Sequence, residues 1–310
     1  MEKIIARQKK RYPLMEKQDL LKLLLQSQSA GGHMISNKES ALAYLKKETE
    51  TISGDNLYLY EEISDKFVRL NLKPYKKYNF CLDYLNDVFV QTANDTVIKD
   101  IYYQGEKIGL NHHSEIYRNN YFPAYRVIDK SFITEEMRYI QVLNFLELMK
   151  KVNNKVTIVA LEGRCASGKT WLSEKLTDYT ILHIDDFFLP EEKKLKEFGG
   201  NVNYEAVKSV LTKLKANEKM VYQKYNCTTN TYQEAVLIPG NCLILEGVYS
   251  YHPNIRNLID YLIFLDTEAD IRSARLEKRI LYERYINEWI PQEEQYFETF
   301  DIKYLSDLIV

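Results

Sequence analysis

Eight residues, Gly163-Arg164-Cys165-Ala166-Ser167-Gly168-Lys169-Thr170, constrain the fold of this 310-residue chain more than any other segment. They match the pattern G-x-x-x-x-G-K-[ST] in full. The β-branched run 156–161 leads directly into them, and the helix-like segment 171–176 follows. A glycine-rich loop between a strand and a helix turns successive backbone N–H groups toward one anion. We therefore expect these residues to bind the phosphates of a nucleotide.

The remainder of the C-terminal half predicts a parallel sheet. Short apolar runs without polar alternation are typical of strands that are buried on both faces. Such runs occur at 156–161, 181–184, 242–245, 261–265 and 308–310, with helix-like segments between them. We predict an α/β fold of the P-loop NTPase type, in which helices cover a parallel sheet.

A polar run at 150–155 is the best candidate for a linker, so we predict domains at 1–150 and 151–310. Just before it, Thr134 precedes a segment with helical apolar spacing and can cap that helix. The first 150 residues also predict a helix at Asp19–Gln28 that stops near Gly31-Gly32-His33. Strands are expected at 57–60 and 67–72, whereas 87–93 fits either type. We predict an N-terminal α+β domain.

Composition excludes several classes of protein. Lys and Arg number 42 against 44 Asp and Glu, and this balance disfavours binding to nucleic acid. No apolar stretch is long enough to span a membrane, and the charged start does not resemble a secretory signal, so we expect a cytoplasmic protein. The four cysteines form no C-x-x-C pair, which argues against a zinc or disulfide scaffold.

Acidic residues follow two of the expected strands. Asp185 and Asp186 come directly after one, and Glu246 ends another. An aspartate at this edge of a parallel sheet can accept the proton of a substrate hydroxyl, although Asp is also common in turns and helix caps. We expect Lys169 to reach the β- and γ-phosphates of ATP, and Thr170 and Glu246 to serve Mg²⁺.

Taken together, these motifs resemble the uridine kinase and phosphoribulokinase family. The resemblance rests on the phosphate loop, on Asp185-Asp186-Phe187-Phe188, on Glu246-Gly247 after an apolar strand, and on the arginine-rich segment Asp270–Arg279. Bacterial uridine-kinase-like proteins look most similar, and nicotinamide riboside kinases share the D-D-F-F feature. The resemblance covers about residues 155–310 and none of the N-terminal half.

The resemblance implies an ATP- and Mg²⁺-dependent kinase that phosphorylates a hydroxyl of a small molecule, with a nucleoside as the preferred acceptor. It implies Asp185 as the base, with Asp186 as second choice. It also implies a lid helix whose Arg275 and Arg279 stabilise charge on the phosphates, with Arg272 beside them. A solvated basic helix face is the alternative interpretation of these arginines.

The acceptor motif departs from the family in two places. Asn203 stands where uridine kinases carry an Asp that holds the ribose, and no His follows Tyr225 in the base-reading strand. An amide can still hydrogen-bond a diol, so nucleosides stay in view while other alcohols gain weight. The candidate substrate residues are Asp186, Asn203, Tyr204, Tyr225 and Arg272.

The N-terminal half carries no motif that we can assign. The segment 112–126 is dense in ionisable and aromatic groups, which fits either a second ligand site or local packing, and no metal-ligand spacing accompanies its histidines. An alternative for the whole chain is a nucleotide-sensing regulatory or scaffold protein whose N-terminal domain binds a partner. A homo-oligomer is compatible with the sequence.

Overall fold

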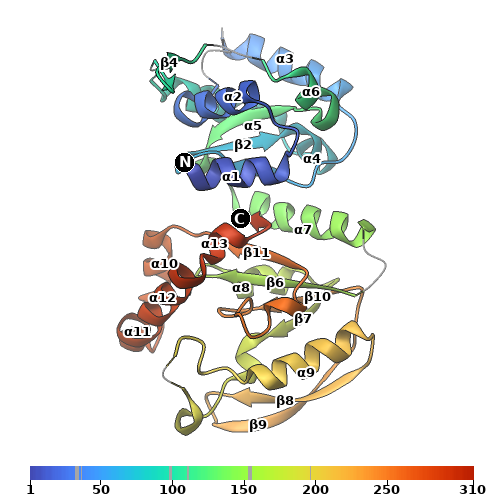
Figure 1. Cartoon of the computed structure of the whole chain (residues 1–310), viewed down its shortest axis with the longest axis vertical. Helices are drawn as coiled ribbons and strands as arrows, with labels where there is room; N and C mark the ends of the chain where they lie inside the picture. The colour runs from blue at the N-terminus through green and yellow to red at the C-terminus, as the bar shows by residue number, and fades with distance from the viewer. Residues whose placement is uncertain (32–34, 36, 98–99, 110–111, 153–155, 196) are drawn as a thin grey trace. The chain divides into compact units, whose positions relative to one another are not determined.

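The computed structural model describes residues 1–31, 35, 37–97, 100–109, 112–152, 156–195 and 197–310 (Figure 1). The chain divides into two compact units, Met1–Phe145 and Leu146–Val310. The division falls inside helix α7 (Glu135–Val152), as does the boundary predicted after residue 150. Thr134 caps this helix as expected, since its Oγ1 accepts from the backbone N–H of Met137 at 3.2 Å. Residues 153–155 of the predicted linker lie outside the described part.

An antiparallel sheet with strand order β1-β2-β5 organises the N-terminal unit. Its strands are β1 (Tyr60–Glu62), β2 (Phe67–Asn71) and β5 (Tyr125–Asp129), and β3 (Tyr102–Tyr103) pairs with β4 (Glu106–Lys107) separately. The helices are α1 (Glu2–Arg11), α2 (Lys17–Ser29), α3 (Lys38–Thr51), α4 (Leu72–Lys77), α5 (Leu82–Asn94) and α6 (Glu115–Tyr121). The predicted α+β class is therefore observed.

Both faces of this small sheet are covered. On one face, Val68 and Leu70 belong to a core that includes residues of α3 and α5. On the other face, Phe67 packs in a core with the leucines of α2. As a result every residue of β2 is buried, including Arg69, which alternates with the apolar positions.

Two details differ from the expectations for this unit. The strand expected at 57–60 begins only at Tyr60, because the Gln141 side chain accepts from the backbone N–H groups of Leu59 and Tyr60 at 2.6 and 3.2 Å. The ambiguous segment 87–93 is helical, within α5. The expected helix at 19–28 is confirmed as α2, while residues 32–34 of its predicted stop lie outside the described part.

A five-stranded parallel sheet with strand order β12-β11-β6-β10-β7 forms the centre of the C-terminal unit. Its strands are β6 (Thr157–Gly163), β7 (Thr180–His183), β10 (Cys242–Glu246), β11 (Tyr261–Leu265) and β12 (Leu308–Ile309), and all five apolar runs noted in the sequence contribute. Chain order reverses at β6, which has β11 on one side and β10 on the other. Ligands of open parallel sheets bind beyond the carboxyl ends of the strands at such a point.

Helices and one hairpin surround this sheet. The helices are α8 (Lys169–Lys175), α9 (Tyr204–Lys215), α10 (Ala269–Leu276), α11 (Tyr282–Arg284), α12 (Ile290–Phe300) and α13 (Ile302–Leu305). The hairpin joins β8 (Met220–Asn226) to β9 (Thr231–Leu237). Apolar residues of α9 and α12 pack in one core with the sheet strands, which fixes the strand ends that carry the polar residues.

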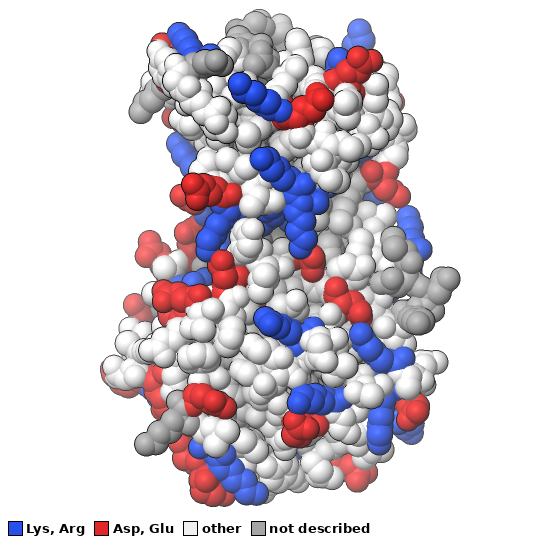
Figure 2. All heavy atoms as spheres, in the orientation of Figure 1, with Lys and Arg blue, Asp and Glu red and all other residues white. Residues whose placement is uncertain are grey.

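Two global features are plain from the structure. None of the helices in the described part of the chain has the length and apolar character that crossing a bilayer requires. Figure 2 shows basic and acidic side chains intermingled on the face in view, in keeping with the net charge of -2.

Candidate functional site

The phosphate loop connects β6 to α8, and its backbone adopts conformations that favour small residues. Gly163 and Gly168 have φ values of +149° and +101°, and Ala166 has a φ of +61°. A Cβ atom on Gly163 would lie 2.7 Å from the carbonyl oxygen of Leu265, so the close approach of β11 also requires glycine there. The sequence pattern thus corresponds to a tight loop that opens into the helix N-terminus, the arrangement that binds phosphate.

Lys169 lies across this loop. Its Nζ donates to the carbonyl oxygens of Gly163 at 2.7 Å and of Arg164 at 3.0 Å. The side chain is buried, so these carbonyls supply the partners that a buried ammonium needs. The positive charge is therefore held at the mouth of the loop.

Helix α12 fastens the first half of the loop. The Glu293 side chain accepts from the backbone N–H of Cys165 at 2.8 Å, and Glu294 pairs with Arg164, its two oxygens lying 2.7 and 2.9 Å from Nε. Burial raises the pKa of Glu293 and raises that of the Cys165 thiol to about 11, which leaves this thiol protonated at neutral pH. These contacts hold the first half of the loop against α12.

Thr170, Glu246 and His183 form a chain of contacts beside the loop. The Thr170 hydroxyl donates to one Glu246 oxygen at 3.3 Å, and the other oxygen lies 2.6 Å from His183 Nδ1. The hydrogen bond to Glu246 is the main cause of the raised pKa of His183. The sequence identified Thr170 and Glu246, but not the histidine that orients the carboxylate.

This pair fits Mg²⁺. One hydroxyl and one carboxylate are a small set of hard oxygen ligands, and Mg²⁺ in phosphoryl-transfer sites completes its shell with water and phosphate oxygens. Among the residues that the structure describes, no three His, Cys, Asp or Glu side chains gather into a metal site. Two protein donors suit a metal that takes its remaining ligands from water and the phosphates of a nucleotide.

Asp185 follows β7 in a short 3₁₀ turn, at the mouth of the sheet. Desolvation by the surrounding protein and the like charge of Glu246 raise the pKa of its carboxyl to about 6, whereas Lys169 lowers it. Desolvation is the larger of the two causes, and the side chain still keeps contact with solvent. The carboxylate thus faces both the candidate metal ligand and the loop lysine while remaining open to an incoming group.

Asp186 has a different environment. It is buried, accepts a hydrogen bond from the Tyr222 hydroxyl at 2.7 Å and pairs with Lys224 at 2.7 Å. Both partners belong to strand β8, so Asp186 fastens the hairpin to the sheet edge. Its oxygens are occupied by chain partners, in contrast to those of Asp185.

Glu162 is a further carboxylate at the end of β6, and the sequence analysis missed it. It is completely buried, and it accepts from the backbone N–H groups of Tyr249 and Tyr251 at 2.7 and 2.9 Å and from the Ser250 hydroxyl at 2.8 Å. Burial raises its pKa to about 7, although these hydrogen bonds oppose the shift. The contacts tie the loop after Glu246 to the strand that enters the phosphate loop. An acid directly before the first glycine of the motif was the only signal for it.

Two of the three candidate lid arginines contact the phosphate loop, and the third is linked to it through Thr267. Arg275 Nη1 donates to the Ala166 carbonyl at 3.1 Å, and Arg279 Nη1 lies 3.9 Å from Cys165 Sγ. Arg272 Nε donates to the Thr267 carbonyl at 3.2 Å, and Thr267 Oγ1 in turn donates to the Ser167 carbonyl at 2.8 Å. Arg279 lies beyond the end of α10, so the expected single helix is shorter than 270–279.

The candidate acceptor residues surround the hairpin and the start of α9. Asn203 caps α9, its side chain accepting from the Ala206 N–H at 3.2 Å. Tyr204 is buried and stacks on His252 with ring centroids 4.3 Å apart. Tyr225 bonds through its hydroxyl to Asn230 at the hairpin turn. The charge of Asp185 helps raise the pKa of Cys227, after desolvation, which places this turn near the candidate base.

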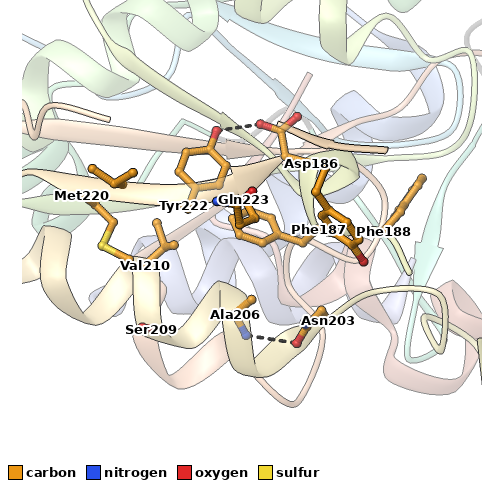
Figure 3. A pocket seen from close by; sticks show the side chains of 12 residues that line it. Asp186, Phe187, Phe188, Asn203, Ala206, Ser209, Val210, Met220, Tyr222 and Gln223 are labelled. Carbon is orange, nitrogen blue, oxygen red and sulfur yellow. Dashed lines mark hydrogen bonds between the residues drawn. The ribbon is translucent and has the colours of Figure 1, made fainter. Parts of the chain in front are cut away.

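A cavity of about 300 Å³ lies between the hairpin and α9 (Figure 3). Its lining is mostly apolar, with Asp186 and Tyr222 joined at one side and Asn203 at another. Asp185, Lys169 and the loop are not among its lining residues. The cavity therefore lies on the hairpin side of the two aspartates.

Comparison with known proteins gives a consistent picture for this unit. Residues 158–284 match the model of the phosphoribulokinase / uridine kinase family. Uridine kinases of Bacillus cytotoxicus and Bacillus thuringiensis are 28% and 27% identical over 186 residues, about 51% of this chain and 86% of theirs. Among solved structures, a possible uridine kinase from Bacillus stearothermophilus covers 54% of this chain and 98% of its own, with 18% identity and a TM-score of 0.44. The family resemblance inferred from the motifs is confirmed for residues 158–284.

Proposed function

We propose, from the match of residues 158–284 to the phosphoribulokinase / uridine kinase family, that the C-terminal unit transfers the γ-phosphoryl group of ATP to a hydroxyl of a small molecule, with a nucleoside as the acceptor class. The observation that carries this proposal is the position of Asp185. Its carboxylate is open to solvent and feels the charges of both Glu246 and Lys169. A protein that only senses a nucleotide has no need of such a base.

Each part of the site has a task in this reaction. Bound Mg²⁺-ATP supplies the phosphoryl group and the metal charge that stabilises it in transfer. Lys169 and the backbone N–H groups of the loop hold the phosphates, while Thr170 and Glu246 provide the metal ligands. Asp185 orients the acceptor hydroxyl and accepts its proton as the oxygen bonds to the γ-phosphorus, while the bond from that phosphorus to the β,γ-bridging oxygen breaks and ADP leaves. Arg275 and Arg279 place positive charge beside the loop.

The nucleoside class is supported by the 28% identity to uridine kinases and by the site's own groups. Cys227 of the hairpin turn lies near Asp185, and Tyr225 is two residues before it in the same hairpin. An aromatic ring with neighbouring amides can stack on a base and hydrogen-bond its edge. The side-chain oxygen of Asn203 caps α9, and its NH2 group can donate to a hydroxyl of the acceptor.

The proposal is tested by measuring ADP release with Mg²⁺-ATP against a panel of nucleosides and small alcohols, with mass spectrometry of the products. We expect one phosphorylated product class. Asp185→Asn should lower kcat by at least about a hundredfold, since general-base catalysis contributes on that order, while ATP binding measured by calorimetry is retained.

Asp178→Asn is the matched control, because Asp178 is exposed in the same unit and away from the loop. This variant should turn over like the parent protein. Equal turnover of Asp185→Asn would remove the assignment of the base. Tight ATP binding without any acceptor-dependent ADP release would remove the proposed kinase activity.

A further inference from the structure

Arg69, in the middle strand of the N-terminal sheet, is a buried cation with open hydrogen-bond donors. Its side chain has 0% exposure, and Nε donates to the Gln26 side chain at 2.8 Å. The two terminal nitrogens, Nη1 and Nη2, have no hydrogen-bond partner among the residues that the structure describes. A guanidinium carries five donors, and a buried charge without a partner is strongly destabilising. The unit folds around this group, so its open donors need an explanation.

A second cation lies close to Arg69. Lys22 is on α2, one turn before Gln26, and is partly exposed. Desolvation and then the like charge of Arg69 lower the pKa of Lys22. Two positive groups therefore lie close together, Arg69 fully buried and Lys22 partly exposed to solvent. Such a pair favours a negative charge between or beside them.

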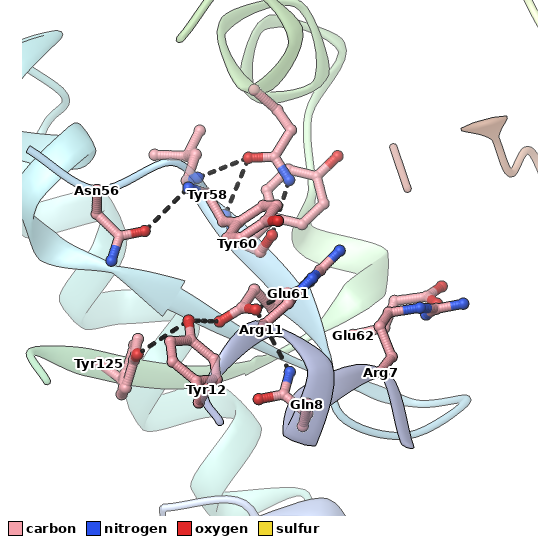
Figure 4. A network of polar contacts seen from close by, with 12 residues as sticks. Arg7, Gln8, Arg11, Tyr12, Asn56, Tyr58, Tyr60, Glu61, Glu62 and Tyr125 are labelled. Atoms are coloured by element: carbon pink, nitrogen blue, oxygen red, sulfur yellow. Dashed lines mark hydrogen bonds and ion pairs between the residues drawn. The ribbon is translucent and has the colours of Figure 1, made fainter. Parts of the chain in front are cut away.

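Two carboxylates of the surrounding elements, Glu61 and Asp19, are already engaged. Glu61 lies opposite Arg69 in the strand pairing, yet its oxygens bind Arg11 at 2.8 Å, Tyr12 at 2.7 Å and Gln8 at 3.4 Å (Figure 4). The structure therefore pairs Glu61 with Arg11 and gives Arg69 no ion pair with it.

Asp19 is saturated in the same way. It accepts from the backbone N–H and the hydroxyl of Ser114 at 2.9 and 2.7 Å, from Glu16 N–H at 3.0 Å, and from His113 Nδ1 at 2.9 Å. Burial, followed by the charge of Arg69, lowers the pKa of His113 to about 3, so this histidine is neutral and adds no positive charge. Both acids have their full complement of donors without Arg69.

We propose that the N-terminal unit binds a small oxyanion, a phosphate or carboxylate group, that pairs with the open donors of Arg69 and with Lys22. The planar guanidinium fork matches two oxygens of either group, and Lys22 adds a charge that accepts any geometry. The ring of Tyr125 lies 5.4 Å from the Arg69 guanidinium and forms one side of the proposed anion site. This site is separate from the phosphate loop and does not depend on the kinase proposal.

The test uses the full chain and hydrogen exchange resolved by peptide, with inorganic phosphate or succinate added at ionic strength matched by sodium chloride. We expect one of the two anions to slow exchange in β2, α2 and α6. Peptides of the phosphate loop report separately on anions bound there. Arg69→Met should weaken the apparent affinity at the N-terminal peptides by at least about tenfold, as loss of charged hydrogen bonds does.

Arg126→Met is the matched control, because Arg126 is a buried arginine of β5 that is paired with Glu48 at 2.6 Å. It should keep the anion response. Lys22→Met, at the partly exposed position, keeps the test valid if Arg69→Met does not fold, and should also weaken the response. Slower exchange with phosphate alone or with succinate alone identifies the ligand group. No response of the N-terminal peptides to either anion would overturn the proposal, and so would responses in Arg69→Met and Lys22→Met as strong as that of the parent protein.

Discussion

Gly247, directly after Glu246, occupies a position where a larger residue would have no room for its side chain. Its φ is +138°, and a Cβ atom there would lie 2.3 Å from Ile184 Cγ2. We predict that Gly247→Ala lowers the free energy of unfolding of the C-terminal unit by about 2–4 kcal/mol, since strain and overpacking act together. Urea denaturation monitored by peptide-resolved exchange measures this.

Gly109→Ala is the control for that change. A Cβ atom at Gly109 meets nothing within 4 Å, and its backbone does not require glycine. The free energy of unfolding of Gly109→Ala should stay within about 0.5 kcal/mol of that of the parent protein. A Gly247→Ala protein of unchanged stability would show that Ile184 and the loop can move aside without cost.

His183 is expected to act through Glu246. Its 2.6 Å contact holds one oxygen of the carboxylate, while the other oxygen faces Thr170. We predict that His183→Ala raises the Mg²⁺ concentration for half-maximal ADP release about tenfold or more, because lost orienting partners of metal ligands cost about that much. The KM of the acceptor should change little.

His183→Asn, whose amide can still donate to a carboxylate, should recover part of the metal affinity. An unchanged Mg²⁺ dependence in His183→Ala would mean that Glu246 needs no orienting partner. The sequence could not predict this contact, because a histidine at the end of an apolar strand has no pattern of its own. The partner lies on β10, a strand that is distant in the chain and adjacent only in the sheet.

At the scale of elements, the β8–β9 hairpin depends on its bond to Asp186. The Tyr222 hydroxyl and Lys224 both contact this carboxylate, and Tyr222 also stacks on Phe187 at 5.3 Å between centroids. We predict that Tyr222→Phe keeps the ring packing but loosens the hairpin by about 1 kcal/mol, the usual net contribution of one hydrogen bond. Faster hydrogen exchange in β8 and a higher acceptor KM would follow.

Tyr232→Phe is the matched change on the opposite strand, since Tyr232 is 49% exposed. It should leave exchange in β8 unaltered. If Tyr222→Phe also leaves it unaltered, the salt bridge with Lys224 alone holds the hairpin.

The elements differ in how far the sequence predicts them. The five strands of the parallel sheet are confirmed because continuous apolar runs can be satisfied only by burial on both faces. The loop is predicted because glycine, lysine and threonine at fixed spacing serve one physical purpose. The different environments of Asp185 and Asp186 could not be predicted, because the partners of Asp186 are on a hairpin that only the fold brings near.

The N-terminal unit illustrates the opposite case. Arg69 alternates with apolar residues in β2, a pattern that predicts a strand with one polar face. The structure covers that face with α2, so the same residue becomes a buried charge. Alternation in the sequence tells which side chains share a face but not whether a helix will cover it.

At the scale of the whole unit, pH should change stability through His252. Burial lowers the pKa of this histidine from 6.5 to about 4 in the fold. Between these values the unfolded chain binds the proton and the folded chain does not, so the free energy of unfolding falls as pH drops from about 6.5 to about 4. The loss attributable to His252 is at most about 3 kcal/mol.

The free energy of unfolding of the parent protein and of His252→Phe is measured by urea denaturation at several pH values. The difference between the two proteins is compared, because other titrating groups also make the free energy of unfolding depend on pH. Glu162, with its pKa raised to about 7, makes the free energy of unfolding rise as pH drops. Both proteins contain Glu162, so its contribution cancels in the difference. The aromatic replacement retains the stacking on Tyr204. Parallel stability curves for the two proteins would contradict a neutral His252 in the fold.

The position of Lys169 has a consequence for which anions this protein retains. Its ammonium already has two oxygen partners from the chain. A ligand that offers a single oxygen merely substitutes one acceptor for another and gains little. A chain of linked phosphates can contact the lysine and the loop amides at once, so we expect competition with the protein's own carbonyls to favour tri- and diphosphates over monophosphates.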